Sequence, residues 1–452
     1  MLCPYWEPMH YGDRKPTAYI EPMHYGDRNK CRQPAERTYF MEPMHMEPMI
    51  RLGLISCWYR EKSCGRFAHN LACALKRLGV EITVISANCL CFRDHPFQPE
   101  LFFSPCRKLR FPDLYWKPAP LAISYLRAVG ELATDALKGL GYLAKASSCS
   151  ILHYQQTQGS FGFLPLLSFL SYPTQARRVI SIHEIDTVQT QLKIKSRTFS
   201  TAWLNRIYHK ADAIIVQTCA LGKRLEELGV NPSKIRLIPH GTRLPSRRPS
   251  PASWLKGAGS GSWPPQYRIA FCGGHHLTSG KGFDTLLDAL LILKGQGIEP
   301  EVMIYGLNEG YGQEKGQKLL RELGLSHRFT WFDYRSDDAL FEELQKALVM
   351  VIPYTSSEAG AAVTAAMANA VAVIATRNAG LPEYLGEGGL YIEENNPREL
   401  AEAIKRLVQN PDLRDDLGRR LYRRASHLYT WEAIARKTLD VYEELLGKVN
   451  LR

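Results

Sequence analysis

The chain has 452 residues, 45% of them hydrophobic, which suits two globular domains with packed cores and is too long for one ordinary domain. The longest apolar stretch, Phe161–Leu170, is well short of the about 20 residues that span a membrane, and no apolar core of a secretory signal leads the chain. The formal charge of +12 is concentrated in residues 51–250, which carry a net +16. This excess indicates an anionic partner, such as a membrane surface, an acidic polymer or nucleic acid, or else a solvated basic face.

The eleven cysteines are scattered and include no CxxC pair with the spacing of metal ligands. We therefore expect buried thiols in a reducing compartment, and a cytoplasmic protein, rather than a disulfide framework.

The first 48 residues are repetitive. EPMHYGDR occurs at 7–14 and again at 21–28, and MEPM occurs at 41–44 and 46–49. The repeat is too short and polar for a solenoid unit, so residues 1–48 are predicted to be a low-complexity extension without a fold of its own. We hypothesise that Met49 is the natural initiator. Mass spectrometry of the native N-terminus would reject this if it found the first repeat.

A regular alternation begins at residue 50. IRLGLIS is a short, β-rich apolar run, the apolar positions of 67–78 have helical spacing before Gly79, and EITVIS at 81–86 is the next strand. Strand, helix and strand at this spacing predict a βαβ unit and a parallel sheet. Further strands are expected at 151–154, 178–183, 211–218 and 234–241.

Residues 244–267 contain five prolines and several Gly and Ser, which predicts a linker. A second series of strands follows at 268–273, 301–306, 328–332, 348–353, 371–376 and 389–394, with helical patterns between them. Asn396 and Asn410, each followed by proline, are predicted helix caps, and a last helix runs from about 431 to 446.

The sequence thus predicts an α/β protein of two tandem, doubly wound, Rossmann-like domains, residues 49–243 and 268–430, facing each other across a cleft. A final helix and tail occupy 431–452. Ligands of such sheets bind at the carboxyl ends of the strands, so the cleft is the expected site.

Two candidate sites lie in the second domain. Gly274 and His275 follow the strand at 268–273, and Lys281 stands at the head of the next helix, an arrangement that suits a diphosphate as well as a plain glycine-rich turn. The loop at 354–360 leads into a helix of small residues. Its N-terminus can hold a phosphate, Glu358 can accept hydrogen bonds from a sugar, and the alternative is tight helix packing on the sheet.

Two further candidates lie in the first domain. His183 follows a strand directly and faces the expected cleft, although a buried structural histidine is the alternative. Glu184 and Asp186 are acid/base candidates or helix caps. Gly65, in the loop before the first helix, permits close contact with substrate or serves only as a turn.

At these residues the chain resembles the retaining glycosyltransferases of family 4, the group 1 transferases with the GT-B fold. The resemblance runs from about Ile50 to Leu446. It rests on YHKADAIIVQT…IPHGT, which resembles the segment ending in "IPNGV", on GGHHLTSGKGFDTLLDAL, on MANAVAVIATRNAGLPEYLGEGGLYIEE, and on YTWEAIARKTLDVYEELL, which resembles the helix that crosses back to the first domain.

The resemblance implies roles for matching residues. Lys281 matches the lysine of the donor diphosphate, His183 the histidine near the transferred sugar, and Gly65 the glycine-bearing loop. The predicted donor-binding set is Gly65, Gly274, His275, Lys281, Ser357, Glu358, Gly360, Ala361 and Ala362, with Lys281, His183 and Glu358 as the predicted catalytic residues.

The chain departs from the family pattern at three places. His240 replaces the asparagine of "IPNGV", and His275 replaces the arginine before the lysine. The paired glutamates, spaced E-x7-E, fall on Ser357 and Ala365, so Glu358 substitutes only after a local shift.

The resemblance implies transfer from a nucleotide-diphosphate sugar with retention of configuration, without metal or other cofactor. The expected acceptor is a glycan, a lipid-linked molecule or a small molecule. Two alternatives stay open: a degenerate protein that binds a nucleotide sugar without turnover, and a sugar-nucleotide epimerase. The basic, aromatic segment 103–120 is predicted to touch an anionic membrane or to pack in the core, and no nucleic acid is expected as a partner.

Overall fold

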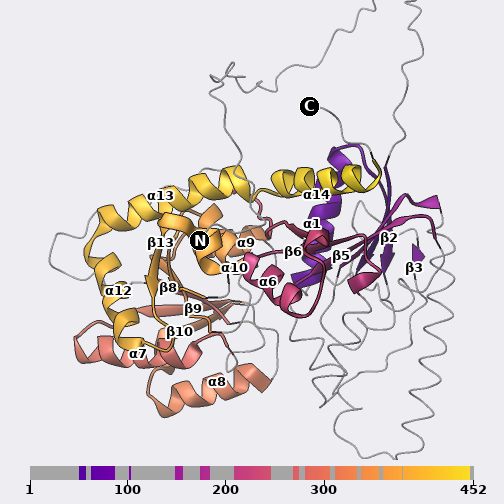
Figure 1. Ribbon diagram of the computed structural model, residues 1–452. Coiled ribbons are helices and arrows are strands. Elements are labelled where there is room, and N and C mark those ends of the chain that lie inside the picture. Colours follow the sequence, from indigo (N-terminus) through magenta and orange to yellow (C-terminus); the bar gives the residue numbers. More distant parts are fainter. Residues whose placement is uncertain are drawn as a thin grey trace, which may run out of the picture. The chain divides into compact units, whose positions relative to one another are not determined.

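The computed structural model describes residues 50–56, 63–86, 101–102, 148–155, 174–183, 208–245, 268–273, 280–305, 311–332, 337–355, 360–378 and 380–447. Within these ranges the chain forms two parallel β-sheets with helices packed against them (Figure 1).

The first sheet has seven strands in the order β3-β2-β1-β4-β5-β6-β7, all of them parallel. β1 pairs with β2 and β4, with Leu52 opposite Ile82 on one side and Ile151 on the other. All of the strands predicted in this half are confirmed, and the two-residue β3 was not foreseen. The strands are β1 (Arg51–Ser56), β2 (Glu81–Ser86), β3 (Leu101–Phe102), β4 (Ile151–Gln155), β5 (Arg177–Ile182), β6 (Ala213–Val216) and β7 (Ile235–Leu237).

Helix α1 (Ser63–Arg77) connects β1 to β2 and buries its apolar stripe against the first sheet. Phe67, Leu71 and Leu75 lie in one core cluster with Leu52 and Leu54 of β1. Gly79 follows the helix with φ +86°, the left-handed conformation that glycine adopts most readily after a helix end. Among the described residues of this half, further helical segments are α6 (Cys219–Glu227) and the 3₁₀ turn η3 (Pro232–Lys234).

The second sheet has six parallel strands in the order β10-β9-β8-β11-β12-β13. They are β8 (Arg268–Cys272), β9 (Glu301–Tyr305), β10 (Phe329–Phe332), β11 (Val349–Ile352), β12 (Ala372–Thr376) and β13 (Gly389–Ile392), which confirms the predicted series. β11, between β8 and β12, is buried along its whole length, because helices cover both faces of a parallel sheet.

Alternate strand residues of this sheet enter two different cores. Ile269 and Phe271 pack with α7 and α12 on one face, whereas Ala270 packs with α9 and α10 on the other. The helices are α7 (Phe283–Gly295), α8 (Tyr311–Glu322), α9 (Asp337–Leu344), α10 (Gly360–Ala368), α11 (Leu381–Leu385), α12 (Pro397–Gln409) and α13 (Pro411–Leu428), with 3₁₀ turns η5 (Ser326–Arg328) and η6 (Gly386–Gly388).

One of the two predicted asparagine caps has the expected geometry. The Asn396 side chain accepts a hydrogen bond from the backbone N–H of Glu399 at 3.1 Å, and the Glu399 carboxylate accepts one from the Asn396 amide at 3.3 Å. Asn410 holds the cap position of α13, but its side chain donates instead to the carbonyl of Arg406 at 2.8 Å. Asn410 is the single residue between α12 and α13, and its side chain caps the end of the first helix rather than the start of the second.

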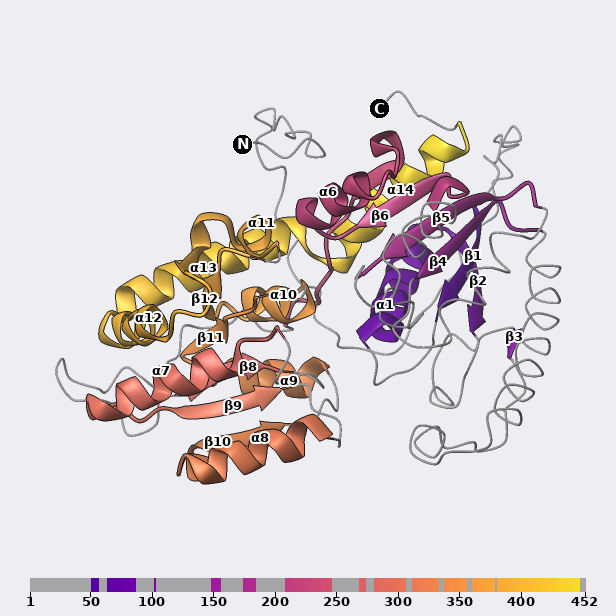
Figure 2. The same ribbon diagram turned by 60° about the horizontal axis from the view of Figure 1, so that its bottom comes forward.

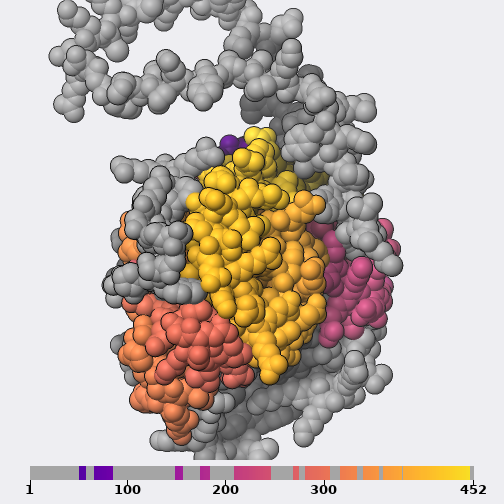
Figure 3. Space-filling view, turned by 90° about the vertical axis from the view of Figure 1, so that its left-hand side faces the viewer, coloured from indigo at the N-terminus to yellow at the C-terminus, as the bar shows by residue number. Residues whose placement is uncertain are grey.

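The last helix, α14 (Trp431–Leu445), returns to the first sheet, as predicted (Figures 1 and 2). Trp431, Ile434 and Tyr442 belong to the core cluster that holds α1 and β1. The Arg77 guanidinium pairs with Glu432 at 2.7 Å, and the Arg236 guanidinium pairs with Glu444. In the space-filling view the C-terminal residues, in yellow, form a continuous surface (Figure 3).

No helix among the described residues is both long and apolar enough to cross a membrane. Cys73, Cys149 and Cys272 are free thiols, as expected, but only Cys149 of these three is buried and the other two are partly exposed. Cys219, the first residue of α6, is disulfide-bonded, which makes the expectation of a free thiol wrong at that position.

Candidate functional site

Lys281 lies where β8 and β11 of the second sheet end. Its ammonium sits 4.1 Å from the centroid of the Tyr354 ring, two residues beyond β11. Gly282 caps α7 with φ +68°, and a Cβ added there would come within 1.9 Å of the carbonyl oxygen of Pro353. Only glycine fits this turn, so the backbone fixes Lys281 beside the segment that leads from β11 to α10.

Hydrogen bonds stiffen the same edge. The backbone N–H of Thr355 donates to the carbonyl of Gly280 at 2.9 Å, and the Tyr354 hydroxyl donates to the carbonyl of Cys272. The Thr376 hydroxyl donates to the carbonyl of Tyr354 at 2.5 Å. Lys281 is thereby tied to the ends of three neighbouring strands.

Helix α10 begins at Gly360 with its N-terminus against residues of the first sheet. A Cβ added at Gly360 would lie 2.8 Å from the Cβ of His240, 2.9 Å from the hydroxyl of Tyr384 and 3.2 Å from the Oε1 atom of Gln217. Every residue of α10 except Ala361 is buried, so the predicted packing against the sheet is present as well. The exposed amides of a helix N-terminus carry a partial positive charge that favours an anion.

His183 follows β5 at the carboxyl edge of the first sheet and hydrogen-bonds through both ring nitrogens. The Gln217 amide nitrogen donates to Nδ1, and Nε2 donates to Oε1 of Gln155 at 3.0 Å. The Phe67 ring meets the imidazole edge-on, with centroids 4.8 Å apart. Both interpretations of His183 thus hold in part: the imidazole is fixed by hydrogen bonds like a structural histidine, and it lies at the sheet edge where the site was expected.

Polar contacts continue from His183 into the core. The Gln155 amide nitrogen donates to Nε2 of His153 at 3.0 Å, and Nδ1 of His153 donates to the Tyr442 hydroxyl of α14 at 2.6 Å. His153 and Gln155 have no exposed surface. Buried polar groups of this kind are stable only when paired, and here each is paired.

Burial sets the protonation state of the three histidines of this edge. It lowers the pKa of His153 and of His183 to about 3, each helped by a neighbouring histidine, and lowers the pKa of His240 to about 4. His240 also meets Phe67 and Trp431 edge-on, with centroids 5.1 Å and 5.5 Å apart. All three imidazoles are therefore neutral at physiological pH, and none supplies a cation.

Helix α11 contacts the start of α6. The Glu383 carboxylate accepts hydrogen bonds from the backbone N–H groups of Cys219 at 2.7 Å and Ala220 at 3.3 Å. Burial raises the pKa of the Glu383 carboxyl, while these two bonds oppose the rise. The Tyr384 hydroxyl accepts a hydrogen bond from the backbone N–H of His240 at 2.9 Å. These contacts join the segment after β12 to the first sheet.

The structure places some predicted site residues and leaves others undescribed. Lys281, His183, Gly360, Ala361 and Ala362 lie at the strand edges described above, and Gly65 lies in the first turn of α1 rather than in the loop before it. Gly274, His275, Ser357, Glu358, Glu184, Asp186 and the segment 103–120 lie outside the described residues.

Sequence reasoning missed several residues of the site: Gln155, Gln217, Glu383, Tyr384 and Tyr442. A signal existed for Gln155 and Gln217, because each ends an apolar run that forms a buried strand. A buried amide requires a partner, but no sequence pattern names that partner.

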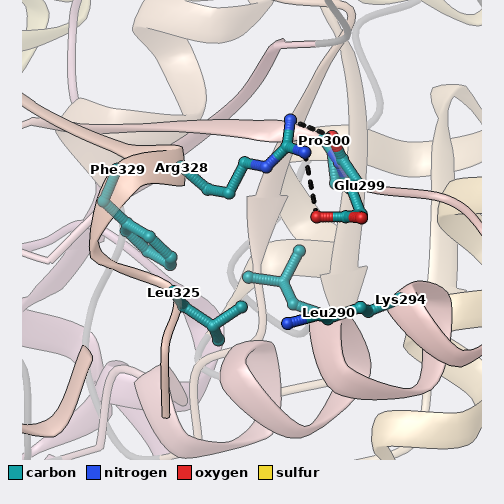
Figure 4. A pocket seen from close by; sticks show the side chains of 7 residues that line it. All are labelled: Leu290, Lys294, Glu299, Pro300, Leu325, Arg328 and Phe329. Atoms are coloured by element: carbon teal, nitrogen blue, oxygen red, sulfur yellow. Dashed lines mark hydrogen bonds and ion pairs between the residues drawn. The ribbon is translucent and has the colours of Figure 1, made fainter. Parts of the chain in front are cut away.

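A small hollow lies elsewhere, at the opposite edge of the second sheet (Figure 4). It is lined by residues that precede or begin β9 and β10, including Pro300 and Phe329, and Arg328 pairs there with Glu299 at 2.9 Å. Ligands of parallel sheets bind at the carboxyl ends of the strands, so this hollow is not the candidate site.

Comparison with known proteins gives two family matches that together cover most of the described chain. Residues 64–244 match "Glycosyltransferase Family 4", and residues 264–424 match "Glycosyl transferases group 1".

Individual relatives agree. The chain is 32% identical to an uncharacterized glycosyltransferase of Methanocaldococcus jannaschii over 36% of this chain and 45% of that protein. It is 23% identical to the MMP alpha-(1->4)-mannosyltransferase of Mycolicibacterium hassiacum over 88% of this chain and 99% of that one. The first curated relatives are matched over only about half of their own length.

The solved structure of Anabaena Alr3699/HepE in complex with UDP superposes with a TM-score of 0.60 at 14% identity, covering 88% of this chain and all of that one. This likeness, with the two parallel sheets and the returning α14, defines a two-domain α/β protein of the GT-B fold. The two family matches go further: both halves of the chain resemble the GT-B glycosyltransferases of the family 4 type.

Proposed function

We propose that this protein transfers a sugar from a nucleotide-diphosphate sugar to an acceptor, with retention of configuration and without a metal ion. The observation that carries the proposal is the place of the Lys281 ammonium, over Tyr354 at the carboxyl edge of the second sheet, where the chain leads from β11 to α10. An ammonium and the backbone N–H groups of a helix N-terminus together suit a diphosphate. The MMP mannosyltransferase relative and the UDP complex of the HepE protein support the same class of reaction and donor.

In the proposed reaction the bond between the sugar and the diphosphate oxygen breaks, and negative charge develops on that oxygen. Lys281 and the amides of Gly360, Ala361 and Ala362 stabilise this charge more in the transition state than in the ground state. The leaving phosphate accepts the proton of the acceptor hydroxyl, so no paired carboxylates are needed, in contrast to a glycoside hydrolase.

The neutral state of the three histidines at the first sheet supports an orienting role for His183 rather than a role as a proton donor. A histidine with a pKa of about 3 does not act as an acid, and both nitrogens of His183 are engaged. His183 is therefore proposed to orient the transferred sugar. The proposed donor site is completed by Gly65, Gly274, His275, Ser357 and Glu358. The proposed acceptor is a glycan or a lipid-linked molecule. Residues 103–120 are proposed to make a peripheral contact with an anionic membrane.

The test is a screen of UDP, GDP and ADP sugars by calorimetry, followed by a transfer assay with glycan acceptors. Binding of one nucleotide sugar and acceptor-dependent release of the nucleotide are expected. Binding without release would indicate an inactive nucleotide-sugar-binding protein, and conversion of the donor without acceptor would indicate an epimerase. No binding of any nucleotide sugar would reject the proposal.

A further inference from the structure

Gln217, directly after β6, is a polar residue whose side chain lies against the start of α10. Only 7% of its surface is exposed, and its Oε1 atom lies 3.2 Å from the position of a Cβ added at Gly360. Its other amide atom, Nε2, donates to Nδ1 of His183. One end of the carboxamide is thus used to fix the side chain, and the other faces the helix N-terminus.

The direction of this amide follows from the hydrogen bonds behind it. Nε2 of His183 donates to Oε1 of Gln155, and Nε2 of Gln155 donates to His153. A neutral imidazole that donates through Nε2 must accept at Nδ1, so Gln217 has to offer its N–H₂ group to His183. The oxygen of Gln217 is therefore left to point at Gly360.

We propose that Gln217 is a sugar-contacting residue that accepts a hydrogen bond from a hydroxyl of the transferred sugar, and that His183 is a positioning residue that acts through Gln217. This inference rests on the proposed function, because it requires the diphosphate at the start of α10. The sugar is attached to that diphosphate, so its hydroxyls are expected to lie close to the Gln217 carboxamide, which flanks the N-terminus of α10. The carboxamide oxygen of Gln217 can accept a hydrogen bond from a sugar hydroxyl, and this adds no charge to an edge whose three imidazoles are neutral.

Four more side chains continue the hydrogen-bond network that holds the Gln217 amide and His183. Gln155, His153 and Tyr442 continue the hydrogen bonds from β4 to α14, and Ser181 of β5 also contacts Nε2 of His153 at 2.8 Å. The Gln217 amide is thus anchored to the returning helix and not only to its neighbour. A preorganised acceptor of this kind distinguishes sugars that differ in a single hydroxyl.

The experiment compares Gln217→Met with the wild-type protein by calorimetry, using UDP, GDP and ADP and their glucose, mannose and N-acetylglucosamine derivatives. Methionine keeps the length of the side chain and removes its hydrogen bonds. We expect Gln217→Met to bind the best nucleotide sugar roughly 5- to 10-fold more weakly, which is the effect of losing one hydrogen bond. Its affinity for the matching nucleoside diphosphate without a sugar is expected to change less than about 2-fold. The matched control, Gln345→Met, removes the Gln345 amide, which donates to Asn369 just beyond the other end of α10, and leaves both affinities unchanged.

A double-variant cycle separates positioning from direct contact. His183→Phe is expected to weaken sugar binding as Gln217→Met does, and the double variant is expected to be no weaker than either single one. Multiplied losses in the double variant would mean that His183 contacts the sugar itself, and would overturn the inference.

Other outcomes also overturn it. Equal weakening of the free diphosphate and the nucleotide sugar would make Gln217 merely structural, and so would an unchanged affinity for both. If Gln217→Met does not fold, Gln217→Asn shortens the side chain by one methylene and is read in the same way. Failure of the wild-type protein to bind any nucleotide sugar instead rejects the proposed function, so the two failures are distinguishable.

Discussion

The carboxyl edges of the two sheets carry opposite chemistry. The first sheet presents imidazoles and amides that are buried, paired and uncharged, with the pKa of His183 held at about 3. The second sheet presents the Lys281 ammonium and the start of α10, where positive charge accumulates. Under the proposed function, this contrast assigns the recognition of hydroxyl groups to the first edge and the stabilisation of the leaving anion to the second.

Removing the cation of the second edge has the largest expected effect. Lys281→Ala is expected to lower turnover by roughly 10²- to 10³-fold, as for loss of one donor that stabilises the transition state. The control, Lys294→Ala, changes a lysine in the last turn of α7 and is expected to leave turnover unchanged. Steady-state kinetics of nucleotide release measure both, and full activity of Lys281→Ala would reject the charged role of this edge.

The second prediction disturbs the turn that holds Lys281. Gly282→Ala places a methyl group against the carbonyl of Pro353 at a positive φ, so we expect a loss of about 2–3 kcal/mol of stability together with reduced turnover. Gly297 has a similar φ of +75° with nothing within 4 Å of an added Cβ.

Gly297→Ala is therefore a matched control that isolates the steric clash. It is expected to cost about 1 kcal/mol from backbone strain alone and to leave turnover unchanged. Urea denaturation compares the two variants. Equal losses in both would show that the contact with Pro353 does not constrain Lys281.

The third prediction concerns the stability of the protein at low pH, which depends on the neutral histidines of the first edge. The unfolded chain protonates His153 near pH 6.5, whereas the folded protein keeps it neutral down to about pH 3, so stability is complete above pH 6.5 and falls as the pH decreases. Between pH 7.5 and 5.0 we expect His153 to account for a loss of about 2 kcal/mol in urea denaturation.

His153→Gln is expected to weaken this pH dependence, measured in the same way. The same pH dependence in wild type and His153→Gln would contradict the account of a neutral, paired His153.

The smallest expected effect lies where α11 meets α6. Glu383→Gln replaces one of the two carboxylate oxygens that accept from backbone N–H groups at the N-terminus of α6, so we expect it to cost about 0.5–1 kcal/mol of stability. Glu387→Gln changes an exposed carboxylate in the next turn and is expected to cost nothing measurable. Thermal unfolding of both variants checks this, and an unchanged Tm for Glu383→Gln would show that the second acceptor oxygen does not stabilise this contact.

The strands were predictable from sequence because strands of a parallel sheet are buried on both faces and are continuous β-branched runs. β11 and β12 are clear cases, buried at every residue. Lys281 and Gly360 were also predictable, since each stands where a strand ends and a helix begins.

The neutral edge was predictable only in part. His183 was found by its place after β5, but its partners come from β4, β6 and α14, and the contact between His153 and Tyr442 joins residues 289 positions apart. Likewise, α6 is capped from a second part of the chain by Glu383. Pairings of this kind depend on tertiary packing, which no local pattern carries.

The central claim is that the second edge holds a nucleoside diphosphate. A crystal structure of the protein with the nucleoside diphosphate that binds most tightly tests it most directly. The account predicts phosphate oxygens within hydrogen-bonding distance of the Lys281 ammonium and of the backbone N–H groups of Gly360, Ala361 and Ala362. A nucleotide whose phosphates lie away from both Lys281 and the start of α10 would contradict it.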